Sequence, residues 1–115
     1  MSVTVANTSS PGGDDAAWLW WHQSGADAVG FRIGPDGWRL VRIDGGAETE
    51  LDHGSTSIAS SAKRVRFRQV GGTVWVYVGS SLVTSVGGLP AASGTLGLEA
   101  RNSSVNFDDV LVYSF

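Results

Sequence analysis

Residues 63–79 read Lys63-Arg64-Val65-Arg66-Phe67-Arg68-Gln69-Val70-Gly71-Gly72-Thr73-Val74-Trp75-Val76-Tyr77-Val78-Gly79. Apolar and polar side chains alternate on both sides of the glycine pair, which predicts two β-strands joined by a tight hairpin turn. A two-residue turn also determines which residues of the two strands lie opposite each other. The predicted pairs are Val70 with Thr73, Arg68 with Trp75, Phe67 with Val76, Arg66 with Tyr77 and Val65 with Val78.

The predicted hairpin has an apolar face and a polar face. The apolar face consists of Val65, Phe67, Val74, Val76 and Val78. The polar face consists of Arg64, Arg66, Arg68, Trp75 and Tyr77. An exposed cation over an aromatic ring contributes about 0.5–1 kcal/mol, so this face can be a self-supporting surface on which arginine stems cover the rings. The same residues can instead form a platform on which a planar or sugar ring stacks, with arginine donors around it.

Short alternating segments continue through the rest of the chain. Sixteen glycines, three prolines and frequent Val, Trp and Thr are typical of an all-β protein. Strands are predicted over residues 2–7, 16–23, 28–33, 37–44, 47–52, 63–70, 73–78, 81–86, 95–101 and 105–113. They indicate an antiparallel jelly-roll-type β-sandwich of about nine or ten short strands, in which the C-terminal strands, from the hairpin onward, form one continuous meander.

Length and composition restrict the class of protein further. A chain of 115 residues is long enough for one hydrophobic core, so residues 1–115 are expected to form a single domain. Cysteine is absent, which excludes disulfides and thiolate metal sites. The net charge of −3 and the pI near 5.1 argue against a nucleic-acid partner.

Neither a membrane segment nor a signal peptide is predicted. No apolar stretch approaches the roughly 20 residues that span a bilayer. The start, Met1-Ser2-Val3-Thr4-Val5, lacks the basic and apolar regions of a signal peptide. The compartment stays open at this point, and a virion or an extracellular surface is compatible with the sequence.

The hairpin and the segments that follow it resemble a known superfamily. Residues 65–69, the Gly71-Gly72 turn, residues 74–78 and residues 79–83 are followed by 94–102 and 105–110. This order resembles the C-terminal half of the concanavalin A-like lectin and glucanase superfamily, including laminin-G-like (LamG-type) modules, and residues 28–43 match more loosely. The resemblance implies a concanavalin A-like sandwich and a function anywhere among lectins, hydrolases and structural modules.

The resemblance also predicts an oligomer. Such modules usually extend well beyond this length, and the strands that precede the equivalent of residues 3–5 are missing here. An uncovered strand edge would pair with another chain. We therefore expect a homo-oligomer in which a neighbouring copy covers the edge.

Three carboxylates lie close together in the segment from residue 48 to residue 52. The resemblance implies Glu-x-Asp-x-x-Glu spacing for a glucanase, because retaining hydrolysis needs two carboxyl groups about 5–5.5 Å apart. Glu48, Glu50 and Asp52 are expected to share one strand face but lack that spacing. A solvated edge strand with Glu48 near Arg42 accounts for them. No catalytic residue is assigned, and the chain is not expected to be an enzyme.

The other polar candidates also fall short of a site. His22 and His53 are the only histidines, and neither has a second ligand at metal spacing or the partners of a catalytic triad. His22 is expected on the same face as Trp18 and Trp20. The pattern is compatible with a partly buried histidine and with one that contacts a sugar. Asp108 and Asp109 suggest Ca²⁺, but neighbouring residues of a strand point to opposite faces, so their carboxylates diverge. No metal and no cofactor are expected.

A cluster of tryptophans supplies a second candidate surface. Trp18, Trp20 and Trp21 lie within four residues, so the strand carries an indole on each face. If Leu19 and Trp21 face the core, Trp18 and Trp20 are partly exposed, and exposed aromatic clusters mark binding surfaces. Either a ligand or a neighbouring subunit could cover them.

Two functions follow from these features. The first is a non-catalytic, lectin-like β-sandwich that binds carbohydrate through Trp75, Tyr77, Arg66, Arg68 and Arg64, with Trp18 and Trp20 as further contacts. The alternative is a structural assembly protein, such as a bacteriophage capsid decoration or tail component, in which the same surfaces bind protein neighbours. A fragment of a glycoside-hydrolase-like domain comes third. The expected partner is a glycan or a protein, and not nucleic acid or a membrane.

Overall fold

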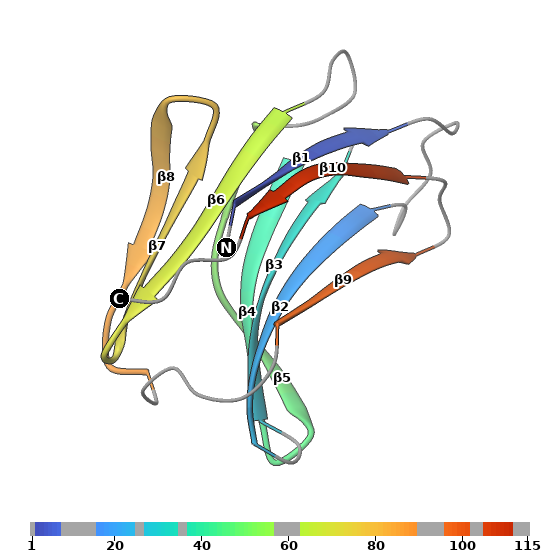
Figure 1. The fold of residues 1–115 in the computed structure, drawn as a ribbon. Coiled ribbons are helices and arrows are strands. Elements are labelled where there is room, and N and C mark those ends of the chain that lie inside the picture. The colour runs from blue at the N-terminus through green and yellow to red at the C-terminus, as the bar shows by residue number, and fades with distance from the viewer. Residues whose placement is uncertain are drawn as a thin grey trace.

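Two antiparallel sheets form the molecule (Figure 1). The computed structural model describes residues 2–7, 16–24, 27–34, 37–56, 63–89, 96–101 and 105–111. The strands within these ranges are β1 (Ser2–Asn7), β2 (Ala16–Ser24), β3 (Asp27–Gly34), β4 (Gly37–Asp44), β5 (Ala47–Gly54), β6 (Lys63–Val70), β7 (Thr73–Val78), β8 (Ser81–Val86), β9 (Leu96–Arg101) and β10 (Val105–Leu111). The first sheet has the order β10-β1-β6-β7-β8, and the second has the order β5-β4-β3-β2-β9. The predicted all-β antiparallel sandwich is confirmed.

The hairpin has the predicted register. Each of the five predicted pairs between β6 and β7 is present. Gly71 has a φ of 57°, a left-handed conformation that glycine adopts without steric cost. A Cβ on Gly72 would lie 2.6 Å from the carbonyl oxygen of Leu89. The amide of Leu89 donates to the carbonyl oxygen of Gly72 at 2.9 Å, so the turn also anchors the segment after β8.

The apolar face of the hairpin lines the core, as predicted. Val65, Phe67, Val74 and Val76 are fully buried, and Val78 is nearly so. They share one cluster with side chains of the second sheet, including Leu19, Phe31, Ile33, Trp38 and Leu40. The two sheets therefore bury their apolar faces against each other, and the polar face of the hairpin is directed outward.

The predicted continuous meander is wrong beyond β8. Strands β6, β7 and β8 are neighbours, but β9 lies beside β2 in the second sheet and β10 returns to the first sheet beside β1. Tight glycine turns keep the first three strands adjacent, whereas the longer connection after β8 permits a crossover. Leu96 and Leu98 on β9 pack against the core from the second sheet.

The expectation of an uncovered edge at residues 3–5 is also wrong. Strand β1 lies between β10 and β6, and Thr4 is opposite Asp108 on one side and Arg64 on the other. The chain's own β10 thus pairs with β1 along the edge that was expected to be uncovered. Because β1 has a neighbour on both sides, this edge gives no reason to expect an oligomer, and the homo-oligomer stays a prediction.

Candidate functional site

An outward-facing surface on the first sheet carries the predicted platform. We call it the Arg–aromatic face, and it consists of Arg64, Arg66, Arg68, Trp75 and Tyr77. Arg66 and Arg68 are exposed, whereas the other three are half-buried. Strict alternation on two paired strands places these residues on one side of the sheet, opposite the buried valines. The structure therefore brings together all five hairpin residues that the sequence singled out.

Cations and rings of this face contact each other in pairs. The guanidinium carbon (Cζ) of Arg66 lies 4.4 Å from the ring centroid of Tyr77. The corresponding distance from Arg68 to Trp75 is 5.4 Å. Both distances fall within the range of a cation–π interaction, which is about 6 Å. The predicted interleaving of guanidinium groups and rings is confirmed, and its role in binding stays a prediction.

Strand β8 borders the rings on their other side. Ser85 is opposite Trp75, and Leu82 is opposite Tyr77, with a register shift between them. Ser85 and Leu82 are both exposed, Leu82 by 52%. Trp75 is half-buried, with the cation of Arg68 over its ring and the short, exposed Ser85 as its neighbour on β8.

The charge of the chain is segregated by segment. Residues 63–98 contain four of the eight basic residues, three of them the arginines of this face, and no Asp or Glu. Because the whole chain has a net charge of −3, the remaining residues carry −7. The Arg–aromatic face is a cationic strip on an otherwise acidic protein.

The prediction that Trp18 and Trp20 are partly exposed is wrong. Trp18 is 2% exposed and Trp20 is 5% exposed. Their rings stack on each other with centroids 4.7 Å apart and planes at 2°. They form a second small cluster with Ala28, Val41 and Ile43, apart from the main core. Each indole thus occupies a face of the other, and we exclude both from the candidate ligand surface.

Three polar side chains that the sequence patterns did not indicate lie around this tryptophan pair. The indole Nε1 of Trp20 donates to Oε1 of Glu99 at 3.0 Å. The guanidinium carbon of Arg39 lies 5.8 Å from the ring centroid of Trp18, and Arg32 is 4% exposed. The pairing of β2 with β9 and with β3, and of β3 with β4, brings these residues together. No spacing within a single segment could have revealed the cluster.

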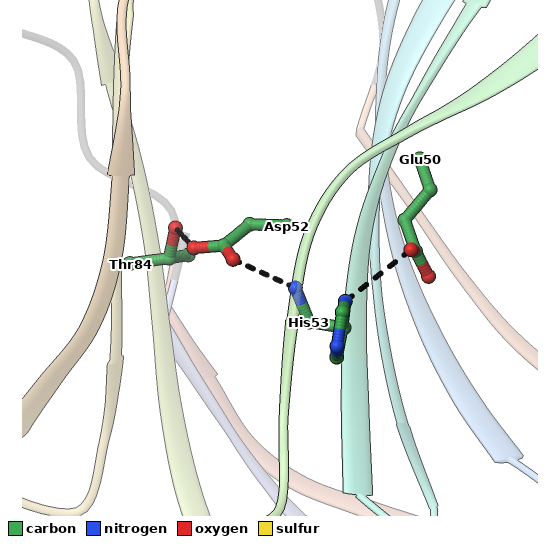
Figure 2. A network of polar contacts seen from close by, with 4 residues as sticks. All are labelled: Glu50, Asp52, His53 and Thr84. Atoms are coloured by element: carbon green, nitrogen blue, oxygen red, sulfur yellow. Dashed lines mark hydrogen bonds and ion pairs between the residues drawn. The ribbon is translucent and has the colours of Figure 1, made fainter.

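The three carboxylates of β5 do not share one face. Val41 is opposite Glu50 and Leu40 is opposite Asp52, so Leu51 is an extra residue in a β-bulge. Leu51 packs against the core, and Asp52 is directed toward the other sheet, away from Glu50 (Figure 2). Glu48 lies opposite Ile43, and Arg42 instead forms an ion pair with Asp44 at 3.6 Å. The predicted common face is therefore wrong because a bulge reverses the alternation after Glu50.

Asp52 joins the two sheets through one hydrogen bond. The hydroxyl of Thr84 on β8 donates to Oδ2 of Asp52 at 2.7 Å, and the amide of His53 donates to Oδ1 at 2.9 Å (Figure 2). The Thr84 hydroxyl and then the His53 amide hold the pKa of Asp52 below its ordinary value of 3.8. This contact links the edge strands β5 and β8 across the sandwich.

We expect Thr84→Val to destabilise the protein by about 1 kcal/mol at neutral pH, because it removes a hydrogen bond to a charged but solvated carboxylate. A carboxyl group whose pKa is lowered by folding stabilises the folded state above its unfolded pKa, and this contribution is lost as the pH falls through the folded pKa. The difference between variant and wild type should therefore shrink below pH 3.8. Urea unfolding at neutral and acidic pH measures this difference in the free energy of unfolding.

Thr49→Val, at an exposed site on β5, is the control. A difference between Thr84→Val and wild type that does not depend on pH would contradict the hydrogen bond from Thr84 to the ionised Asp52.

The histidines and the Asp108-Asp109 pair add no further site. Nδ1 of His53 lies 3.3 Å from Oε2 of Glu50, and its side chain is 74% exposed. The side chains of His22, Asp108 and Asp109 lie outside the described residues. Among the side chains that are described, no three metal-binding residues gather in one place.

The described part of the chain also contains no helix long and apolar enough to cross a membrane.

Comparison with known proteins identifies a structural neighbour. The fold is similar to that of a carbohydrate-binding module, CBM66 from Bacillus subtilis, with a TM-score of 0.76 and 14% sequence identity. The match covers 92% of this chain and 68% of that chain. At this identity the likeness supports the β-sandwich fold alone. No protein-family profile and no curated protein sequence matches the chain.

Proposed function

We propose that this protein is a non-catalytic β-sandwich module that binds carbohydrate through the Arg–aromatic face. The observation that carries the proposal is the pair of outward aromatic residues, each with a guanidinium group beside its ring at 4.4 Å or 5.4 Å. Aromatic rings on rigid strands bury the apolar face of a sugar with little loss of conformational entropy. The fold shared with a carbohydrate-binding module supports the same conclusion.

Each residue of the face has a role in this proposal. Trp75 is the main stacking ring because its neighbour on β8 is the short Ser85. Tyr77 supplies a second ring, two residues along the same strand. Arg66 and Arg68, each over a ring, supply hydrogen-bond donors, and Arg64 extends the row of cations. The relation to concanavalin A-like and LamG-type modules belongs to the same proposal.

Binding without catalysis is supported by the placement of the carboxylates on β5. Retaining and inverting glycosidases need two carboxyl groups that flank the same glycosidic bond. Glu50 contacts His53, whereas Asp52 accepts a hydrogen bond from Thr84 on the opposite sheet. The bulge at Leu51 thus separates the pair that would be needed.

Trp75→Ala tests the proposal. We expect the variant to remain folded and to lose glycan affinity by about 30-fold or more, because truncating a tryptophan hot spot costs about 2 kcal/mol or more. Titration calorimetry with glycans selected from an array measures the affinity, and circular dichroism checks the fold. Leu82→Ala, an exposed apolar residue of the same surface, is the matched control. Unchanged glycan binding by Trp75→Ala would show that the platform lies elsewhere.

A protein neighbour is the second candidate partner, as in a structural assembly such as a virion. Two exposed apolar side chains favour it: Val70 is 42% exposed and Leu82 is 52% exposed. Both flank the Arg–aromatic face, and Trp, Tyr and Arg are enriched in the centres of protein interfaces. Light scattering distinguishes the candidates, since a trimer or larger closed assembly favours assembly and a monomer favours glycan binding.

A further inference from the structure

We infer that the glycan bound by the Arg–aromatic face is acidic: a linear polysaccharide whose sugars carry carboxylate or sulfate groups, lying along β6 and β7. This inference rests on the proposed carbohydrate-binding function and specifies its class of ligand. Four features of the molecule support it, namely the balance of donors and acceptors, the contact of the exposed Arg66 with a ring, the spacing of the arginines, and the overall charge.

The hydrogen-bonding groups around the rings are mainly donors. Arginine donates through five N–H groups and accepts none, whereas carboxylate and amide side chains accept. Residues 63–98 contain four basic residues and no Asp or Glu, so β6, β7 and β8 carry no carboxylate acceptor. Hydroxyls of a neutral sugar need acceptors as well as donors. A carboxylate or sulfate group only accepts, and therefore matches this surface better.

The contact with Tyr77 leaves N–H donors of Arg66 available to a ligand. The Cζ of Arg66 lies 4.4 Å from the centroid of Tyr77, and the side chain is exposed. The N–H groups of a guanidinium lie in its own plane, so a ring against its face does not consume them. A planar fork held in this way can bind a carboxylate or sulfate group through two parallel hydrogen bonds. The aromatic ring thus holds the cation of Arg66 at the surface, where its N–H groups can meet an anion.

The spacing of the residues fits an extended ligand. Alternate residues of a strand lie about 6.8 Å apart, so Arg64 and Arg68 are separated by about 14 Å along β6. Trp75 and Tyr77 form a second row on β7, about 4.8 Å away and parallel to the first. The face therefore consists of a row of cations beside a row of rings, and it is longer than one sugar. A linear acidic glycan along the strands contacts both rows at once.

The overall charge distinguishes this ligand from nucleic acid. A protein that binds a phosphate backbone gains affinity from a net positive charge. Outside residues 63–98 this chain carries −7, so a polyanion that extends past the cationic strip is repelled more strongly the higher its charge density. Acidic polysaccharides with lower charge density, and with apolar sugar faces for the rings, suit a short cationic strip better.

Two matched pairs of polymers test the inference on the full chain. Polygalacturonate is compared with its methyl ester, which has the same backbone without the charge, and dextran sulfate is compared with dextran. We expect the charged member of at least one pair to bind about tenfold or more tightly than its neutral partner, as charge-assisted hydrogen bonds imply. The pair that shows the preference identifies the carboxylate or the sulfate as the recognised group. Affinity electrophoresis and calorimetry measure the binding.

Two variants and a control assign the preference to the face. Arg66→Gln should remove most of the preference for the charged polymer, and Trp75→Ala should weaken its binding. Arg42→Gln removes a cation from the second sheet, where it pairs with Asp44, and should change neither. Arg66 is exposed, so its variant tests the inference even if Trp75→Ala loses stability.

Each other outcome overturns the inference. Equal binding of charged and neutral polymers, lost in Trp75→Ala but not in Arg66→Gln, would retain the proposed function and contradict an acidic ligand. Binding of polyanions that Trp75→Ala leaves unchanged would indicate simple ion exchange. Binding of single-stranded DNA in preference to every glycan, or of no polymer at all, would overturn both the inference and the proposed function.

Discussion

Phe67→Ala should lower the free energy of unfolding by about 3–5 kcal/mol, as is typical of a buried phenylalanine reduced to alanine. The ring of Phe67 is fully buried between the sheets. It forms a T-shaped contact with Trp21 on β2, with centroids 6.2 Å apart and planes at 78°. Removing it leaves a cavity where the hairpin packs against the second sheet. Urea unfolding followed by tryptophan fluorescence measures the loss.

Val70→Ala is the matched control for this prediction. Val70 lies on the same strand but on the outer face, and it is 42% exposed. Its truncation removes few contacts, so its effect should stay within about 1 kcal/mol, the span of β-propensity. Similar losses for both variants would contradict the assignment of the two faces of β6. A loss below about 1 kcal/mol for Phe67→Ala would show that the cavity is filled by rearrangement.

Gly30→Ala should destabilise the protein by about 1–3 kcal/mol, the usual cost of overpacking. A Cβ on Gly30 would lie 2.4 Å from Cε3 of Trp20. Trp20 cannot move aside freely, because it stacks on Trp18 at 4.7 Å and donates to Glu99 at 3.0 Å. Thermal unfolding measures the loss, and near-ultraviolet circular dichroism reports on the tryptophan pair.

The sign of this effect is informative, because replacing a strand glycine with alanine ordinarily stabilises a protein. Gly87→Ala is the control, since its new Cβ would meet only the hydroxyl oxygen of Thr73 at 3.6 Å, an ordinary contact. We expect a change within about 0.5 kcal/mol at that site. A stabilised Gly30→Ala variant would show that Trp20 does not depend on the space above this glycine.

In the hairpin of β6 and β7, the local sequence pattern is enough to predict the structure. Strict alternation around Gly71-Gly72 was sufficient to predict the register of β6 and β7, the buried face and the cation–ring pairs. These features depend only on residues close in sequence and on the two-residue period of a strand. Strand boundaries elsewhere were predicted to within two residues for the same reason.

The wrong predictions for Asp52 and for the two tryptophans Trp18 and Trp20 have a common cause, which is contact between different strands. The direction of the Asp52 side chain depends on a bulge at Leu51, and no residue type in β5 predicts a bulge there. The burial of Trp18 and Trp20 depends on Gly30 of the neighbouring strand, which leaves space for an indole, and on Glu99, which accepts its N–H. Alternation predicts which residues share a face of a strand, but not what covers that face.

By itself, the sequence determined the strands, the hairpin register and the composition of the Arg–aromatic face, because each follows from the period of a strand and the geometry of a glycine turn. The tertiary structure alone decided the crossover of β9 to the second sheet, the place of β1 between β6 and β10, and the contact of Thr84 with Asp52. Those features arise from contacts between segments far apart in the chain, and their free energy depends on how whole sheets pack.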